Sequence, residues 1–203
     1  VHEAKANQRR LEHLARHDAL TGLVNRAEFE RHCSEAIALA ERERLAVVVL
    51  FIDLDAFKIV NDSYSHAIGD RLLVKVGERI RKQLSDGDVA GRIGGDEFTV
   101  LLPRLGLRED ARAIVNRLLS TLSEPVLLDD YEIVLTASIG VAGYPLDGSD
   151  AAALIANADA AMYAAKTEER NAFRFYTPMM HADNRRRQQL ANQLRQALSR
   201  DEF

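Results

Sequence analysis

Cysteine, tryptophan and proline are scarce in this chain: its 203 residues include one cysteine, no tryptophan and four prolines. A single cysteine, Cys33, cannot form an internal disulfide, so a reducing cytoplasm is the simplest compartment to expect. The start of the chain, Val1-His2-Glu3, resembles no signal peptide, although a longer parent protein can carry a membrane anchor elsewhere.

Basic residues are not in excess, and long apolar runs are missing. The net charge of −4 argues against a nucleic-acid-binding surface. No apolar run reaches the roughly 20 residues of a membrane span, so we expect no membrane contact by this segment. The composition, 47% hydrophobic and 29% charged, predicts one globular domain with room for flanking helices.

Apolar patterns predict alternating helices and strands. The continuous run 45–52 predicts a central strand buried on both faces, and Asn25 with Glu28 predicts the start of a helix that ends near Arg44. The order predicts an α+β fold with a mixed, largely antiparallel sheet surrounded by helices. The other expected elements are a helix carrying Leu72 to Leu84, a hairpin around 89–102, a helix over about 108–123, a second hairpin pairing 126–128 with 131–135 and continuing through 138–141, a helix over about 150–168 and an edge strand near 173–176.

The two ends of the chain differ from its middle. Residues 1–17 are polar with near-heptad apolar spacing, which predicts a linker helix entering from an upstream element. Residues 178–203 are arginine-rich, and their leucines leave a thin apolar stripe on a helix. That helix is either a linker toward a neighbouring domain or packs back on this one, and the pattern favours neither. The domain itself is assigned to residues 18–177.

Two glycines followed by two carboxylates, Gly94-Gly95-Asp96-Glu97, predict a hairpin whose tip carries acid. An ordinary solvated turn would have the same sequence. Asp53, however, ends the central strand, and Asp55 shares its face. If these strands are neighbours, three or four carboxylates converge, and unpaired they would repel one another. A divalent cation resolves this, and Mg²⁺ fits best because the six histidines show no ligand spacing.

Amide, carboxylate and basic side chains follow the central strand. Asn61 and Asp70 can together satisfy the donors of guanine. The simpler interpretations are that Asp70 caps a helix beginning at Arg71 and that Asn61-Asp62 is a plain turn. Three cations can bind phosphates: Lys58, and the pair Lys166 and Arg170, four apart at a helix end and facing the same way.

These residues together resemble a known family, the GGDEF domains of diguanylate cyclases. Each motif alone is weak, but seven in this order and spacing are specific. The resemblance covers about residues 18 to 177, and it is carried by Asp18 to Arg26, Phe51 to Lys58, Asn61-Asp62, Gly69-Asp70, Arg92 to Phe98, Ser138 to Val141 and Tyr163 to Lys166.

The resemblance implies a palm-like, nucleotide-cyclase-like sheet that binds one GTP per chain. Two chains would meet face to face in a transient, head-to-tail homodimer and condense two GTP into cyclic di-GMP, releasing two pyrophosphates. By similarity, Mg²⁺, or Mn²⁺ in its place, is bound by Asp53, the carbonyl of Leu54, Asp96 and Glu97. The catalytic residues are Asp96, as proton acceptor, Glu97 and Lys58, and the substrate-binding residues are Phe57, Lys58, Asn61, Asp70, Lys166 and Arg170.

Several positions depart from the family pattern. The family's product-inhibition site has an arginine where this chain has Ser85, while Asp88 keeps its partner position, so we expect weak or no feedback inhibition there. Ser65 and Glu169 replace glycines; Ser65 is expected to stiffen a loop, and Glu169 to weaken triphosphate binding if it points inward.

The ends resemble the connectors of tandem signalling proteins. Residues 1–5 look like the exit helix of an upstream sensory domain, and residues 176–198 look like the connector to a downstream EAL phosphodiesterase domain. Two other hypotheses therefore stay open besides an active cyclase. One is a silent GTP-binding module that regulates an attached phosphodiesterase, and the other is a generic palm-type cyclase acting on a single GTP or ATP.

Overall fold

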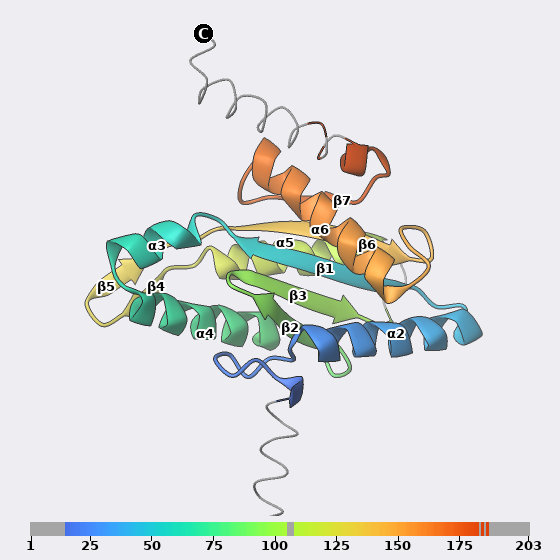
Figure 1. Cartoon of the computed structure of the whole chain (residues 1–203), viewed down its shortest axis with the longest axis horizontal. Coiled ribbons are helices and arrows are strands. Elements are labelled where there is room, and N and C mark those ends of the chain that lie inside the picture. Colours follow the sequence, from blue (N-terminus) through green and yellow to red (C-terminus); the bar gives the residue numbers. More distant parts are fainter. Residues whose placement is uncertain (1–14, 105–107, 183, 185, 187–203) are drawn as a thin grey trace, which may run out of the picture.

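The computed structural model describes residues 15–104, 108–182, 184 and 186. Five of its helices and seven strands alternate along the chain (Figure 1), as the sequence predicted. Their bounds are α2 Arg26–Glu43, β1 Val47–Leu54, α3 Phe57–Ser63, α4 His66–Lys82, β2 Val89–Gly94, β3 Glu97–Leu102, α5 Arg108–Leu122, β4 Val126–Leu128, β5 Tyr131–Ile133, β6 Ala137–Tyr144, α6 Ala151–Glu168 and β7 Phe173–Phe175.

A five-stranded sheet with the order β2-β3-β1-β6-β7 forms the centre of the molecule. Neighbouring strands are antiparallel except β7, which runs parallel to β6 at one edge. The α+β class and the largely antiparallel sheet are therefore confirmed. Helices α2 and α6 cover one face and α4 and α5 the other, and a hydrophobic cluster lies under each pair.

Strand β1 occupies the middle of this sheet, and every one of its residues is buried. Alternate side chains enter the two clusters: Leu50 packs on the α4 side and Val49 on the α2 side. Burial on both faces explains the continuous apolar run that predicted it. The strand continues past that run to Leu54, so Asp53 lies at the end of the strand, as predicted.

The second hairpin was predicted only in part. Strands β4 and β5 pair as expected, but they form a separate two-stranded sheet. Residues 138–141 do not continue this hairpin; they belong to β6, which pairs with β1 along its whole length. The reason is burial, because β6 is apolar and lies inside the main sheet between β1 and β7, whereas β5 is largely exposed.

Helix starts show one correct and one wrong prediction. The Asn25 side chain accepts a hydrogen bond from Glu28 N at 3.0 Å and caps α2, as expected. Asp70, however, is not a helix cap. Helix α4 begins at His66, and its cap is Ser65, whose hydroxyl accepts from Ile68 N at 3.3 Å. Ser65 therefore fixes a helix start and does not merely stiffen a loop.

The flanking segments are described only near the domain. The predicted N-terminal linker falls mostly on residues 1–14, and the leucine stripe on residues 187–203, all outside the described residues. The described start of the C-terminal segment packs back on α6, where His181 Nε2 lies 2.6 Å from Asn157 Oδ1 and Asn184 Nδ2 donates to Ala160 O. None of the described helices combines the length and the apolar character that crossing a membrane requires.

Candidate active site

The acidic hairpin predicted from the sequence joins β2 to β3. Gly95 has a φ of 52°, a left-handed value that glycine adopts without steric cost, so the turn favours glycine there. The register of β1 with β3 places Asp53 directly opposite Glu97, and Leu54 N donates to Asp96 O across the same pair at 3.3 Å. The pairing thus brings Asp53, Asp96 and Glu97 to one end of the sheet.

Arg92 fixes the tip of this hairpin. Its guanidinium donates to Gly95 O at 2.7 and 3.0 Å and reaches both carboxylate oxygens of Asp18 at 3.1 Å. Asp18 also accepts from the backbone and hydroxyl of Thr21. Two motifs far apart in the sequence therefore meet in one network that holds the acidic turn in place.

Asp53 is 6% exposed, and its Oδ1 accepts a hydrogen bond from Lys166 Nζ at 2.6 Å. Burial raises the pKa of the Asp53 carboxyl above its ordinary value, Lys166 opposes that shift, and the nearby charges of Asp96 and Asp55 add to it. One lysine does not compensate the negative charge that meets here. The carboxylate retains an oxygen for a further cation.

Asp55 does not join this cluster, contrary to the expectation from strand alternation. It follows the end of β1 and accepts three hydrogen bonds, from Thr136 Oγ1 at 2.7 Å, Ser138 Oγ at 2.8 Å and Asn171 N at 3.1 Å. Its oxygens are occupied by the fold itself. Asp55 is therefore a structural carboxylate that links β1 to β6 and to the segment after α6.

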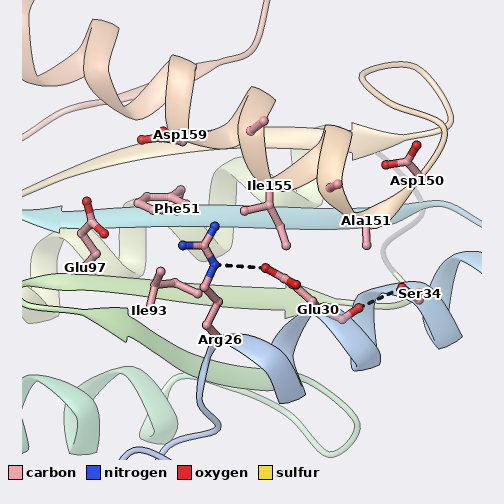
Figure 2. A pocket seen from close by; sticks show the side chains of 12 residues that line it. Arg26, Glu30, Ser34, Phe51, Ile93, Glu97, Asp150, Ala151, Ile155 and Asp159 are labelled. Atoms are coloured by element: carbon pink, nitrogen blue, oxygen red, sulfur yellow. Dashed lines mark hydrogen bonds and ion pairs between the residues drawn. The ribbon is translucent and has the colours of Figure 1, made fainter.

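Asp159 joins the acids, a role that the sequence did not reveal. The pKa of Glu97 is raised first by burial and then by the charges of Asp159, Asp53 and Asp96. Burial also raises the pKa of Asp159, and the charges of His181 and Arg26 partly offset this rise. The sequence offered one signal for this role, because Asp159 is the only acid in the middle of the alanine-rich run of α6. That Asp159 lies near Glu97 depends on the tertiary fold, which places both at one pocket (Figure 2).

The acids fit a hard divalent cation by their chemistry. Asp53, Asp96 and Glu97 offer only oxygen as a ligand atom, and burial first, with neighbouring like charges second, raises the pKa of Asp53 and Glu97. Within the described ranges, no three His, Cys, Asp or Glu side chains are already arranged around one point. A cation would therefore be completed by a main-chain oxygen and by oxygens of a ligand, as Mg²⁺ commonly is.

Helices α3 and α4 bring the predicted base-binding residues together. Asn61 lies within α3 and not in a plain turn, and its Oδ1 lies so close over Gly69 that a Cβ there would be 1.9 Å away. Phe57 contacts the same glycine and is buried. Asp70, the next residue of α4, is exposed beside this contact. The Asn61 amide and the Asp70 carboxylate therefore lie on either side of Gly69. Only glycine at position 69 leaves room for the Asn61 side chain.

The predicted phosphate-binding cations lie in different settings. Lys58 is exposed in the first turn of α3. Lys166 lies in the last turn of α6, whereas Arg170 lies beyond the helix, because α6 stops at Glu168 and Glu169 is extended. The expected helical four-residue spacing of Lys166 and Arg170 is therefore wrong, although both line one shallow pocket. Glu169 is exposed and lies 3.9 Å from Arg174.

Ser85 and Asp88 form a closed turn before β2. Asp88 Oδ2 accepts a hydrogen bond from Ser85 N at 2.9 Å. The carboxylate thus closes its own turn, and no guanidinium stands at position 85 to pair with it.

Comparisons with known proteins identify the family of the chain. The family described as "Diguanylate cyclase, GGDEF domain" matches residues 15–172. The chain belongs to the GGDEF family. This GGDEF domain is 44% identical over 199 residues to the bifunctional diguanylate cyclase/cyclic di-GMP phosphodiesterase MucR of Pseudomonas aeruginosa, covering 97% of the chain and 28% of MucR.

Diguanylate cyclase TpbB of the same species is also similar. This GGDEF domain is 45% identical to TpbB over 165 residues, which are 81% of the chain and 38% of TpbB. A solved structure of the TpbB GGDEF domain superposes with a TM-score of 0.81 at 40% identity, covering 83% of this chain and 99% of that one. The chain thus spans less than two fifths of the length of either curated relative.

Proposed function

We propose that the domain is an active diguanylate cyclase that condenses two GTP into cyclic di-GMP. The observation that carries the proposal is the register that places Asp53 opposite Glu97, with Lys166 on the Asp53 carboxylate and the Asn61–Gly69 contact on the adjoining helices. In this proposal, the acids bind a cation, the lysine binds phosphate and the amide binds the base, which is the combination that a nucleoside triphosphate requires.

Each residue has a physical role in this proposal. Asn61 and Asp70 accept and donate at the guanine edge, where adenine would leave them unsatisfied. Lys58, Lys166 and Arg170 hold the phosphates, and Phe57 supports the base site. Asp53, Leu54, Asp96 and Glu97 would hold Mg²⁺, or Mn²⁺ in its place. When bound, this metal neutralises phosphate charge and lowers the barrier to phosphoryl transfer.

Lys166 has to move for this chemistry. It now donates to Asp53, whereas in the proposed complex it faces the β- and γ-phosphates. The exchange is electrostatically reasonable, because a divalent cation replaces the ammonium on Asp53 and the triphosphate gives the ammonium new acceptors. The Lys166 side chain is 33% exposed, so its release needs no repacking of the core.

The reaction requires two chains. Each chain presents one GTP, and the 3′-hydroxyl of each nucleotide attacks the α-phosphate of the other. Two phosphodiester bonds form, two pyrophosphates leave, and the Asp96 of each chain accepts one hydroxyl proton. Positioning and charge neutralisation supply the catalysis, so the rate depends on how often two loaded chains meet.

The test is product chromatography after incubation of the protein with GTP and Mg²⁺ over a series of protein concentrations. We expect cyclic di-GMP and two pyrophosphates per product, with a specific activity that rises with protein concentration. No cyclic di-GMP even at high protein concentration would overturn the proposal. A product made from a single nucleotide would point instead to a generic palm-type cyclase.

A silent GTP-binding module is the second candidate. The observation that favours it is the Lys166–Asp53 hydrogen bond, because a chain that keeps this bond can hold GTP without completing the metal site. Binding of GTP at micromolar concentration without turnover would distinguish this module from the active enzyme.

We also propose a place for the domain in a longer protein. MucR is named for both a cyclase and a phosphodiesterase activity, and this chain spans 28% of it. A sensory domain before residue 18 and an EAL phosphodiesterase domain after residue 177, acting in the cytoplasm where GTP is available, would use both flanking segments. Phosphodiesterase activity that does not change with GTP in the full-length protein would contradict this coupling.

A further inference from the structure

Arg170 is exposed, but the main chain on both sides of it is held in place. On one side, Glu169 N donates to Ala165 O at 3.0 Å, which closes the end of α6. On the other side, Asn171 N donates to Oδ2 of the buried Asp55 at 3.1 Å. The position of the Arg170 main chain is therefore set by α6 and by the residue that follows β1.

Asn171 has a backbone conformation that few residues adopt. Its φ is 56°, in the left-handed region, where asparagine is enriched and β-branched residues are strained. The chain turns at Asn171, and the next residue, Ala172, accepts a hydrogen bond from Ile139 N of β6 at 2.9 Å. The Asn171 side chain is held as well, because its Oδ1 lies 3.0 Å from Oγ of Ser123, the residue after α5. A residue that avoids this φ would turn the chain away from Asp55 or from β6.

Asp55 connects this segment to the strand that carries the proposed metal ligand Asp53. Asp55 directly follows β1, whose residues are all buried. Two hydroxyl groups also donate to the Asp55 carboxylate, so it has little freedom to move. The bond from Asn171 N joins this fixed carboxylate to the segment that carries Arg170. The place of Arg170 relative to Asp53 therefore depends on the bond between Asn171 and Asp55.

Lys166 and Arg170 line the same pocket of about 430 Å³, although they do not share a helical face. Helix α6 itself positions Lys166, which lies in its last turn. Arg170 lies beyond the helix, so the helical repeat cannot place it beside Lys166. The left-handed turn at Asn171 and its bond to Asp55 are the contacts that fix the main chain next to Arg170.

We propose that Asn171 is a positioning residue that holds Arg170 beside Lys166, where both bind the β- and γ-phosphates. The inference rests on the phosphate-binding role that the proposed function gives to Arg170. Asn171 does not bind phosphate itself, because its backbone N–H and its side chain are already bonded within the fold. It acts by preorganisation: an arginine on a fixed main chain loses less conformational freedom on binding than one on a mobile chain.

The test compares two substitutions at this one position. Asn171→Val disfavours the left-handed conformation, and Asn171→Gly retains it. Calorimetry in the presence of Mg²⁺ measures the binding of 3′-deoxy-GTP, which lacks the attacking hydroxyl, and of GMP, which lacks the β- and γ-phosphates. We expect Asn171→Val to bind 3′-deoxy-GTP about tenfold more weakly than wild type and to bind GMP equally well. Asn171→Gly should stay within about threefold of wild type for both nucleotides.

A double-mutant cycle shows whether Asn171 acts through Arg170. Arg170→Ala alone should weaken the binding of 3′-deoxy-GTP about tenfold, because a charge-assisted phosphate contact is lost. Adding Asn171→Val to this variant should weaken binding by less than about twofold more, because the arginine that Asn171 positions is no longer there. Independent effects would multiply to about a hundredfold, and that outcome would overturn the proposal.

Arg44 provides the matched control. It ends α2 with a φ of 58°, close to that of Asn171, and it lies outside the proposed nucleotide site. Arg44→Val imposes the same backbone strain at the end of another helix, so its affinity for 3′-deoxy-GTP should equal that of wild type. If Asn171→Val does not fold, Asn171→Ala replaces it, with an expected loss of about threefold for 3′-deoxy-GTP alone. An equal loss for GMP and 3′-deoxy-GTP would mean a general structural role and would contradict the proposal.

These measurements distinguish the positioning role from the proposed function. If wild type prefers 3′-deoxy-GTP to GMP and Asn171→Val loses this preference, yet wild type makes no cyclic di-GMP from GTP, the proposed function is rejected and the positioning role is retained. If wild type makes cyclic di-GMP while Asn171→Val binds 3′-deoxy-GTP as tightly as wild type does, the function is retained and the positioning role is rejected.

Discussion

Two aspartates that are two residues apart, Asp53 and Asp55, have nearly the same burial, at 6% and 4% exposed, and opposite surroundings. Asp55 accepts hydrogen bonds from two hydroxyls and a backbone N–H, so the fold fully uses its charge. Asp53 has one lysine and several like charges, and its pKa is raised by burial. The contrast separates a carboxylate that holds the fold together from one that the fold leaves ready for a ligand.

The largest expected effect comes from removing the satisfied carboxylate. Asp55→Ala leaves Ser138 Oγ and Asn171 N without their acceptor, so we expect the free energy of unfolding to fall by about 3 kcal/mol or more in urea titrations. Asp62→Ala, an exposed aspartate on α3, is the control and should change it by less than about 0.5 kcal/mol. A loss under about 1 kcal/mol for Asp55→Ala would mean that the two aspartates do not differ as described.

Substitution of Asp53, unlike that of Asp55, should not lower the free energy of unfolding. Asp53→Asn removes a charge that the folded state holds unfavourably, so without divalent cations the variant should be at least as stable as wild type. Cyclic di-GMP formation should fall at least about a hundredfold, because the metal loses a ligand. A variant that is clearly less stable than wild type at neutral pH would show that the Lys166 bond outweighs burial.

The raised pKa of Asp53 predicts how the free energy of unfolding depends on pH. A carboxyl with a raised pKa in the folded state binds its proton more tightly there than in the unfolded chain, whose pKa is about 3.9. The stability contribution of Asp53 therefore falls as pH rises from about 3.9 through the raised value, and it recovers on acidification. In urea titrations, the free energy of unfolding of wild type minus that of Asp53→Asn should therefore fall as pH rises through this range; a difference that does not change with pH would contradict the assignment.

The base side of the site offers a smaller effect on stability and a clear effect on binding. Gly69→Ala places a methyl group where Asn61 Oδ1 now lies, so Asn61 must turn away from the base site. We expect GTP affinity to fall about tenfold by calorimetry. The helix propensity gained by alanine, about 1 kcal/mol, offsets part of the strain in the free energy of unfolding. Unchanged GTP affinity would remove Asn61 from the base site.

The smallest effect is expected at Asp88, which resembles Asp55 more than Asp53 because the fold already uses its carboxylate. Asp88→Ala should lower the free energy of unfolding by about 0.5–1 kcal/mol and leave inhibition by cyclic di-GMP unchanged. Tight binding of cyclic di-GMP by wild type that is lost in this variant would show that the turn is a product site despite Ser85.

Much of the fold follows from local pattern. The run before Asp53, the hairpin that turns at Gly95-Asp96 and the Asn25 cap each specify their element through short-range physics, and each element is present as predicted. The interpretation of Asp70 as a helix cap was wrong. Aspartate favours helix caps, yet Ser65, five residues earlier, caps α4. Arg170 was placed wrongly on a helical face, because the predicted helix does end near residue 168 and Glu169 is extended, so Arg170 lies beyond α6.

In the candidate site, too, features set by local sequence were predicted and features set by distant contacts were not. Asp53, Asp96 and Glu97 could be grouped from the sequence because strand ends and hairpin tips are local features. Asp55 was grouped wrongly, since its partners Thr136 and Ser138 are distant in sequence. Asp159 was missed for the same reason: the approach of α6 to β3 depends on the tertiary fold, which single-sequence patterns do not encode.

The most direct test of the contrast between Asp53 and Asp55 is the free energy of unfolding of wild type and Asp53→Asn at neutral pH, with and without Mg²⁺ and 3′-deoxy-GTP. If Asp53 is the carboxylate left open for the metal and its nucleotide, ligand at a hundred times its dissociation constant stabilises wild type by about 2.7 kcal/mol and the variant by less than about 0.5 kcal/mol. Equal stabilisation of the two proteins would contradict the account.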